Sequence, residues 1–297
     1  MAATLAQQRA SFRTALTGCG INDPTKDFIV AQGFSTAFEL CQIPPSAMKE
    51  LIKSLERGAR ADPNLTLTYL SILSMRALHA FARYRVSRGE RVNTLGWEAS
   101  WNPAAVGRWI QRVTELTDIK DSDEADKIPD PDALTSWSNY EEFDEQLRIY
   151  LSHHRDPDGK PLNYILRLEA TVTDAMRAQR YPSIDDDIVA TTLLEGDLYN
   201  SNNQRVWDLT HKLYRDGPGW SYAKPFQNAK DGRGAYLAVR AQAYGPAAQQ
   251  KRKNEAYQKM REARYTGQDR RVNLTLYTSI HKDAHTVLDD LAEPMTE

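Results

Sequence analysis

Cysteine is scarce in this chain. Its 297 residues include only two, Cys19 and Cys41. Two cysteines allow one bridge at most, so a disulfide framework and a cysteine-rich zinc site are both excluded. A low cysteine count is typical of a reducing compartment, and we therefore predict an intracellular, cytoplasmic protein.

Long apolar runs and a surplus of one charge are also missing. No run approaches the roughly 20 apolar residues that a membrane-spanning helix needs, so a membrane is not expected as a partner. Residues 1–15 lack the continuous apolar stretch of a secretory signal and are best interpreted as a first helix, the alternative being a weak amphipathic targeting segment. The 38 Lys and Arg against 40 Asp and Glu argue against a protein that coats nucleic acid over its whole surface, but they allow local basic patches.

Catalytic motifs are lacking as well. The chain has no Gly-x-Ser-x-Gly elbow, and the glycines at 217–219 are not followed by the Lys-Ser/Thr of a phosphate-binding loop. His281 and His285 stand four apart on an expected helix, but Lys282 occupies the position where a metalloprotease has Glu. The acidic triplet 185–187 lies at a helix start and is expected to be solvated, because divalent-metal sites gather carboxylates from separate elements. We therefore predict no catalytic residue, metal, cofactor or small-molecule substrate, and hence no enzyme.

The sequence does contain helical periodicity along most of its length. Short apolar stripes punctuated by Gly and Pro fill the first 60 residues, and longer ones cover 65–86, 102–116 and 203–213. Strand alternation and hairpin signals are not convincing anywhere. The predicted fold class is all-α, a multi-helix bundle with a small N-terminal helical module.

Composition divides this helical chain into four parts. We predict a small helical module over 1–60, a helical middle segment over 61–117, an acidic linker over 118–132 and a helical domain over 133–297. The linker holds seven Asp and Glu against two Lys, together with Pro129 and Pro131. Such a composition is typical of a connection between domains.

Four arginines lie in or just after the 65–86 helix, at Arg76, Arg83, Arg85 and Arg88. The favoured interpretation is a solvated helix face, and the alternative is a ridge that contacts phosphates. Further along, Asp231 stands where it can cap a helix, and Gly232 allows the backbone to turn tightly before it. Helices are then expected over 247–264 and 274–291.

The region 219–291 also contains a series of short motifs in a particular order. They are Gly219-Trp220-Ser221-Tyr222, Asp231-Gly232-Arg233-Gly234-Ala235-Tyr236-Leu237, Tyr244-Gly245, Tyr265-Thr266-Gly267, Arg271-Val272-Asn273-Leu274, Ile280-His281 and Ala284-His285. This series resembles the Gag proteins of copia-type retrotransposons, and the stretch 161–167 resembles a short segment upstream in the same family. The resemblance implies a capsid-like helical unit that self-associates into a particle around RNA.

The chain departs from the Gag pattern in two places. It has no zinc knuckle, and it stops at Glu297, where the family usually continues with further helices. We therefore expect a truncated or degenerate copy, with the architecture of a capsid protein but not its full activity.

A basic segment lies inside the Gag-like region. It comprises Lys251, Arg252, Lys253, Lys259, Arg261, Arg264, Arg270 and Arg271, with tyrosines interleaved. These residues are the candidate RNA-binding residues, because arginines contact phosphates and tyrosines stack on bases. The simpler interpretation is a solvated helix with ion pairs between residues four apart. The predicted function is a structural, self-associating Gag-like protein with RNA as a second partner. The alternative is a helical adapter that binds nucleic acid or another protein.

Overall fold

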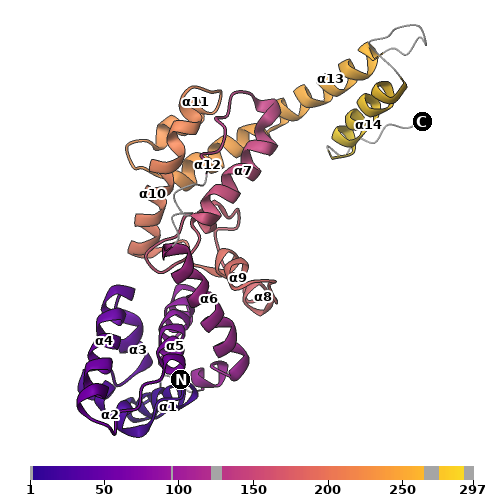
Figure 1. Ribbon diagram of the computed structural model, residues 1–297. Helices are drawn as coiled ribbons and strands as arrows, with labels where there is room; N and C mark the ends of the chain where they lie inside the picture. Colours follow the sequence, from indigo (N-terminus) through magenta and orange to yellow (C-terminus); the bar gives the residue numbers. More distant parts are fainter. Residues whose placement is uncertain (1–2, 95, 122–128, 264–273, 291–297) are drawn as a thin grey trace. The chain divides into compact units, whose positions relative to one another are not determined.

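The computed structural model describes residues 3–94, 96–121, 129–263 and 274–290 (Figure 1). Within these ranges the regular elements are fourteen α-helices and several short 3-10 helices, and no strand forms. An isolated antiparallel bridge joins Arg155 to Pro161 across a turn. The predicted all-α class is confirmed.

The helices fall into two compact units. Unit 1 comprises residues 1–130 and 148–202, and unit 2 comprises residues 131–147 and 203–297. The sequence-based partition instead placed everything after residue 132 in one domain. Residues 148–202 group with the N-terminal helices because charged side chains join them, including the pairs Arg83–Asp158 and Arg112–Asp185. Residues 122–128 of the predicted acidic linker lie outside the described residues.

The element bounds are as follows. Unit 1 contains α1 (Leu5–Gly18), α2 (Asp23–Ala31), α3 (Ala37–Gln42), α4 (Pro45–Ala61), α5 (Tyr69–Ser87), α6 (Pro103–Asp121), η4 (Leu162–Leu166), α8 (Asp174–Ala178) and α9 (Ile184–Thr191). Unit 2 contains α11 (Trp220–Ala223), α12 (Gly232–Ala243), α13 (Pro246–Glu262) and α14 (Leu274–Asp290). Helices α7 (Tyr140–His153) and α10 (Gly196–Arg215) contribute residues to both units. Helix α6 extends to Asp121, so its last turn occupies the start of the predicted linker.

Local capping explains where several helices begin. Reciprocal capping boxes open α1 at Thr4, α3 at Thr36 and α9 at Ser183. Each box satisfies backbone N–H groups that the first helical turn leaves without a partner. Asp231 caps α12, as predicted, and its carboxylate accepts a hydrogen bond of 2.8 Å from the Gly234 N–H.

The core of unit 1 is built around α5. Leu78 and Ala82 are fully buried, and α5 packs against α3 and α6. Phe81 contacts Trp101 and Trp109 with ring centroids 5.2 and 5.9 Å apart, which are typical separations for aromatic pairs. Both cysteines are free thiols: Cys19 and Cys41 are buried in this core.

Aromatic side chains form the core of unit 2. The ring centroid of Tyr140 lies 6.1 Å from that of Phe143 and 5.5 Å from that of Tyr244. The ring centroids of Phe143 and Tyr214 are 5.7 Å apart. Arg240 stacks over Tyr244 and forms an ion pair of 3.1 Å with Asp144. Burial raises the pKa of both Tyr140 and Tyr214, which therefore remain neutral phenols near pH 7.

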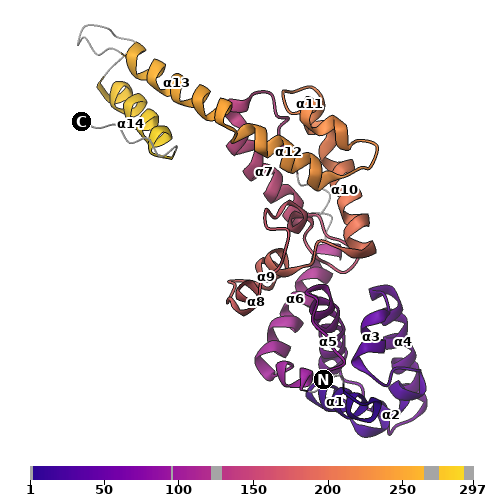
Figure 2. The same cartoon turned by 180° about the vertical axis from the view of Figure 1, so that it is seen from behind.

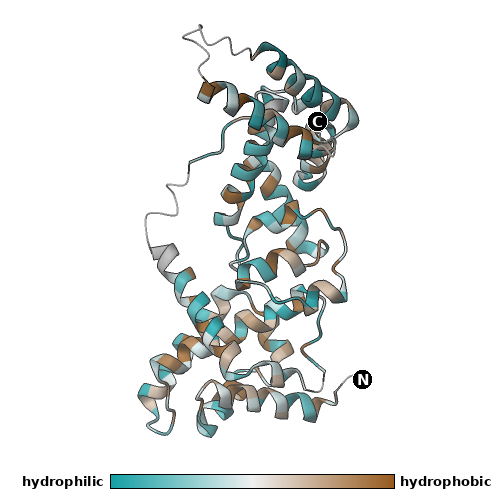
Figure 3. Cartoon of the chain, turned by 90° about the vertical axis from the view of Figure 1, so that its right-hand side faces the viewer, coloured by the Kyte–Doolittle hydropathy of each residue, from teal (hydrophilic) through white to brown (hydrophobic). Residues whose placement is uncertain are grey.

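Hydrophilic and hydrophobic residues alternate along the helices of both units (Figure 3). Such mixing is typical of helices with one face toward a core and one toward water. No helix in the described ranges combines the length and apolar character needed to cross a bilayer.

Candidate functional site

The predicted RNA-binding residues lie mainly on α13, which packs side by side with α14 (Figures 1 and 2). Lys251, Arg252, Lys253, Lys259 and Arg261 belong to this helix. Arg264, Arg270 and Arg271 lie outside the described residues.

The five described cations differ in their environment. Lys251 lies 3.7 Å from Glu255, one turn along the same helix. Arg252 forms an ion pair of 2.8 Å with Glu141 and stacks over Tyr244, so it serves the packing of unit 2. Lys259 and Arg261 are exposed and pair with no acid in the described ranges. The interpretation as a helix with ion pairs therefore fits the start of α13, where Lys251 lies near Glu255. At the end of the helix, Lys259 and Arg261 are exposed cations.

The pairing of α13 with α14 leaves little buried surface. The buried cluster between the two helices comprises Ala256, Ala284 and Leu288, with Tyr257 and Met260 partly buried against them. On α14, Leu276 and Val287 remain 43% and 37% exposed. They share one side of the helix, because eleven residues correspond to about three turns. The hairpin thus presents an apolar edge beside its thin core.

The two histidines considered as metal ligands also lie on α14. The His281 ring lies 4.4 Å from the Tyr277 ring. Across the described residues no group of three or more potential ligands gathers around a common point. We therefore assign no metal to these histidines.

Both sequence-based interpretations are wrong for three of the four arginines, Arg83, Arg85 and Arg88. Arg83, Arg85 and Arg88 are mostly buried and form ion pairs with Asp158, Glu90 and Asp187. Arg88 also donates to the Arg177 carbonyl oxygen at 2.9 Å. These guanidinium groups hold unit 1 together, so they form neither a solvated face nor a phosphate-contacting ridge.

The acidic triplet 185–187 is also more engaged than predicted. Asp185 pairs with Arg112 and Arg155 at 3.1 and 2.7 Å. Asp186 completes the Ser183 capping box. The prediction of solvated carboxylates is therefore wrong for Asp185, which binds two arginines from other elements.

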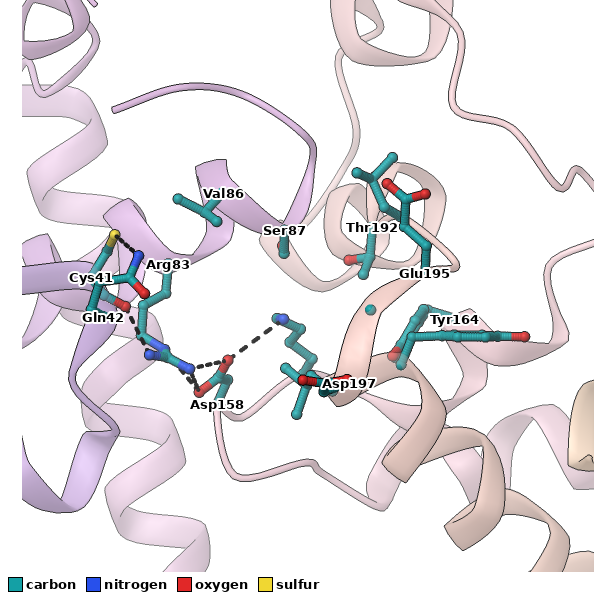
Figure 4. Close-up of a pocket in the computed structure, with 15 residues that line it drawn as sticks. Cys41, Gln42, Arg83, Val86, Ser87, Asp158, Tyr164, Thr192, Glu195 and Asp197 are labelled. Carbon is teal, nitrogen blue, oxygen red and sulfur yellow. Dashed lines mark hydrogen bonds and ion pairs between the residues drawn. The ribbon is translucent and has the colours of Figure 1, made fainter. Parts of the chain in front are cut away.

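A cleft of about 630 Å³ lies in unit 1, and its lining was not predicted from the sequence (Figure 4). Five segments form it: the end of α3, the end of α5, the turn 156–160, Tyr164 of η4 and the segment 192–199. Figure 4 shows Arg83 and Asp158 on one side of the cleft, and Thr192 and Glu195 on the other.

The turn 156–160 presents its charges to this cleft from a buried position. The Asp156 carboxylate accepts hydrogen bonds from the N–H groups of Asp158 and Lys160, both at 2.8 Å, and from the Asn202 amide at 3.0 Å. Gly159 adopts a φ of +76°, and an added Cβ would lie 2.7 Å from Leu116. This tightly held turn fixes where Asp158 and Lys160 lie.

Asp158 connects the turn to α5. Its carboxylate accepts two hydrogen bonds of 2.9 Å from the Arg83 guanidinium, whose third nitrogen donates to the carbonyl oxygens of Cys41 and Ile43. The Lys160 ammonium lies 3.6 Å from the same carboxylate. Arg83 therefore has its donors occupied, whereas Lys160 has only a long contact.

Thr192 lies across the cleft, directly after α9. It is 3% exposed, and its hydroxyl has no hydrogen-bond partner in the described part of the chain. The following residue, Leu193, donates its N–H to the Ser87 carbonyl oxygen at 2.8 Å. This bond holds the segment 192–196 against the end of α5.

Sequence reasoning treated 153–160 as a polar turn and did not single out Thr192. Charged turn residues are normally solvated, so nothing in the local pattern distinguished Lys160 from a surface lysine. The complete pairing of Asp156 and Asp158 depends on Arg83 and Asn202, which are distant in sequence.

Comparisons of the chain with protein-family models, with curated proteins and with solved structures found no match.

Proposed function

We propose that this chain is a non-enzymatic, Gag-like structural protein that self-associates through the α13–α14 hairpin. The order of motifs in 219–291 supports the family, and the exposed apolar edge of α14 supports the activity. The unbridged, buried thiols of Cys19 and Cys41 agree with a reducing compartment inside the cell.

The single observation that carries the proposal is that the hairpin has a small buried core and leaves large apolar side chains exposed. Three buried residues form its core, while Leu276 and Val287 keep about two fifths of their surface in water. Burying apolar area contributes about 25 cal/mol per Å². The same edge on a second copy of the chain would cover these side chains, and self-pairing of one patch is the usual arrangement of a symmetric dimer.

Sedimentation equilibrium of the full chain tests this proposal. We expect mass to rise with protein concentration, and we expect the double variant Leu276→Lys and Val287→Lys to remain monomeric. The matched control is Leu274→Lys, since Leu274 is 58% exposed on the same helix but lies roughly half a turn away from the edge. A wild-type chain that remains monomeric at high concentration contradicts the proposal.

RNA contact by α13 is the second candidate function, and it is favoured by Lys259 and Arg261, whose exposed side chains pair with no acid among the described residues. Phosphate contacts release counterions, so RNA affinity should fall steeply with salt. We expect the double variant Lys259→Glu and Arg261→Glu to lower the RNA affinity and to reduce its salt dependence. The control Lys251→Glu, at a position already beside Glu255, should change the affinity and the salt dependence less. Binding that ignores both salt and the double variant excludes this function.

A further inference from the structure

The cleft of unit 1 contains a buried ammonium group whose hydrogen-bonding capacity is unused. The Lys160 side chain is 6% exposed and carries three N–H donors. No group in the described ranges accepts a hydrogen bond from it, because its contact with Asp158 is 3.6 Å long. Placing an ammonium in a protein interior is unfavourable unless acceptors replace the water it loses. This side of the cleft therefore suits an anionic acceptor.

The opposite side of the cleft has the complementary character. The Thr192 hydroxyl is buried and has no partner among the residues that the structure describes, and a hydroxyl can accept a hydrogen bond as well as donate one. Glu195 lies on the same side in Figure 4, is exposed, and pairs with no cation in the described part of the chain. An oxygen acceptor beside a carboxylate suits an ammonium group.

Aliphatic side chains also line the cleft. Val86 from α5 and Leu193 from the segment after α9 both border the cleft. They could contact the methylene groups of a ligand that carries a charge at each of its two ends. Asp197 also borders the cleft, but it lies in the first turn of α10. There its negative charge interacts favourably with the positive end of the helix dipole.

We propose that this cleft binds a small zwitterion, an ω-amino carboxylate. Its carboxylate accepts hydrogen bonds from Lys160 Nζ, and its ammonium group donates to Thr192 Oγ1 and to the Glu195 carboxylate. A simple dianion fits less well, because its second negative charge would face the Glu195 carboxylate. A metal ion fits less well too, since the described residues hold no cluster of three ligands. The cleft shares no residue with the self-association edge on α14.

Calorimetric titration of the full chain tests the site with matched probes. We would titrate β-alanine, 4-aminobutyrate and 6-aminohexanoate, with butyrate and butylammonium each supplying one charged end alone. A charge-assisted hydrogen bond at the second end is expected to make the best zwitterion bind at least about tenfold tighter than either single-ended probe. Failure of all three zwitterions to bind, or equal binding of butyrate, overturns the proposal.

Three substitutions connect such binding to the cleft. Lys160→Met, Thr192→Val and Glu195→Gln should each lower the affinity for the best-binding zwitterion about tenfold or more. Lys160→Met leaves the Arg83–Asp158 pair intact, and Thr192→Val removes a hydroxyl that bonds to no described residue, so both variants are expected to fold.

The controls change the same residue types on the surface of unit 1. They are Lys49→Met on α4, together with Thr117→Val and Glu115→Gln on α6, and none of these positions borders the cleft. Circular dichroism of every variant establishes that it is folded. Zwitterion binding that is unchanged by all three cleft variants overturns the proposal.

Discussion

The turn 156–160 of unit 1 and the α13–α14 hairpin of unit 2 invert the usual distribution of residue types. In the turn, Asp156 and Lys160 are buried and the Asp158 side chain is only 7% exposed, although all three are charged. In the hairpin, Leu276 and Val287 are exposed although they are apolar. The comparison shows that burial here follows the number of surrounding elements more closely than it follows residue type.

The physical difference lies in the available partners. Polar groups in the turn have partners on three other elements: Arg83 of α5 donates to Asp158, Asn202 of α10 donates to Asp156, and Arg112 of α6 donates to the Gly159 carbonyl oxygen. A buried polar group is tolerated when such partners are present. Two helices packed against each other enclose only a narrow strip, so the hairpin leaves the rest of its apolar residues in water.

Removing the carboxylate at the centre of the turn should have the largest effect. Asp158→Asn leaves Lys160 and Arg83 without their counter-charge, and we expect the free energy of unfolding to fall by about 3–5 kcal/mol. Asp197→Asn, at an exposed position, should cost less than about 1 kcal/mol. Urea unfolding measures both, and similar losses would show that the turn is not held by buried ion pairs.

Core truncations should separate the two regions next. Leu78→Ala in unit 1 should lower the free energy of unfolding by about 2–5 kcal/mol, because it leaves a cavity beside fully buried neighbours. Leu288→Ala should instead reduce amide hydrogen-exchange protection mainly within α14, since the hairpin core is small. If Leu288→Ala lowers protection equally in α5, the hairpin does not open independently.

A glycine pair provides a smaller but sharper test of the turn. Gly159→Ala should destabilise by about 1–3 kcal/mol, because alanine disfavours a φ of +76° and its Cβ would crowd Leu116. Gly107 lies within α6, and an added Cβ there meets no atom within 4 Å. Gly107→Ala should therefore stabilise by about 0.5–1 kcal/mol. Thermal unfolding should show opposite signs, and equal signs would contradict the strain assigned to the turn.

Acid should weaken unit 1 through His79. Burial lowers the pKa of this imidazole below its ordinary value of 6.5, although a hydrogen bond to the Ile43 carbonyl oxygen opposes the change. As the pH falls below about 6.5, the unfolded chain binds the proton first, so stability is lost toward acid pH. The slope from one such group is at most about 1.4 kcal/mol per pH unit. His79→Asn should reduce this slope between pH 7 and 5, whereas His153→Asn, at an exposed position, should retain it.

The all-α class and many helix boundaries could be predicted because their causes are local. Asp231 caps α12 through the Gly234 N–H three residues away, and Gly and Pro separate the helices at positions that the chain itself displays. Apolar spacing likewise indicated α5 and α14. The candidate RNA-binding residues on α13 could be named for the same reason, since charge is a property of each residue.

The states of those charges could not be predicted, because they depend on contacts between distant residues. Arg83 meets Asp158 across 75 positions, and Arg252 meets Glu141 across 111 positions. The grouping of 148–202 with the N-terminal helices also depends on such pairs.

Residue periodicity thus decided which segments are helical, since helix formation is governed by neighbours within one turn. Only the tertiary structure decided that Lys160 and Thr192 border one cleft and that the apolar edge of α14 remains in water. These outcomes depend on which elements pack around each side chain, and no short-range pattern encodes that packing.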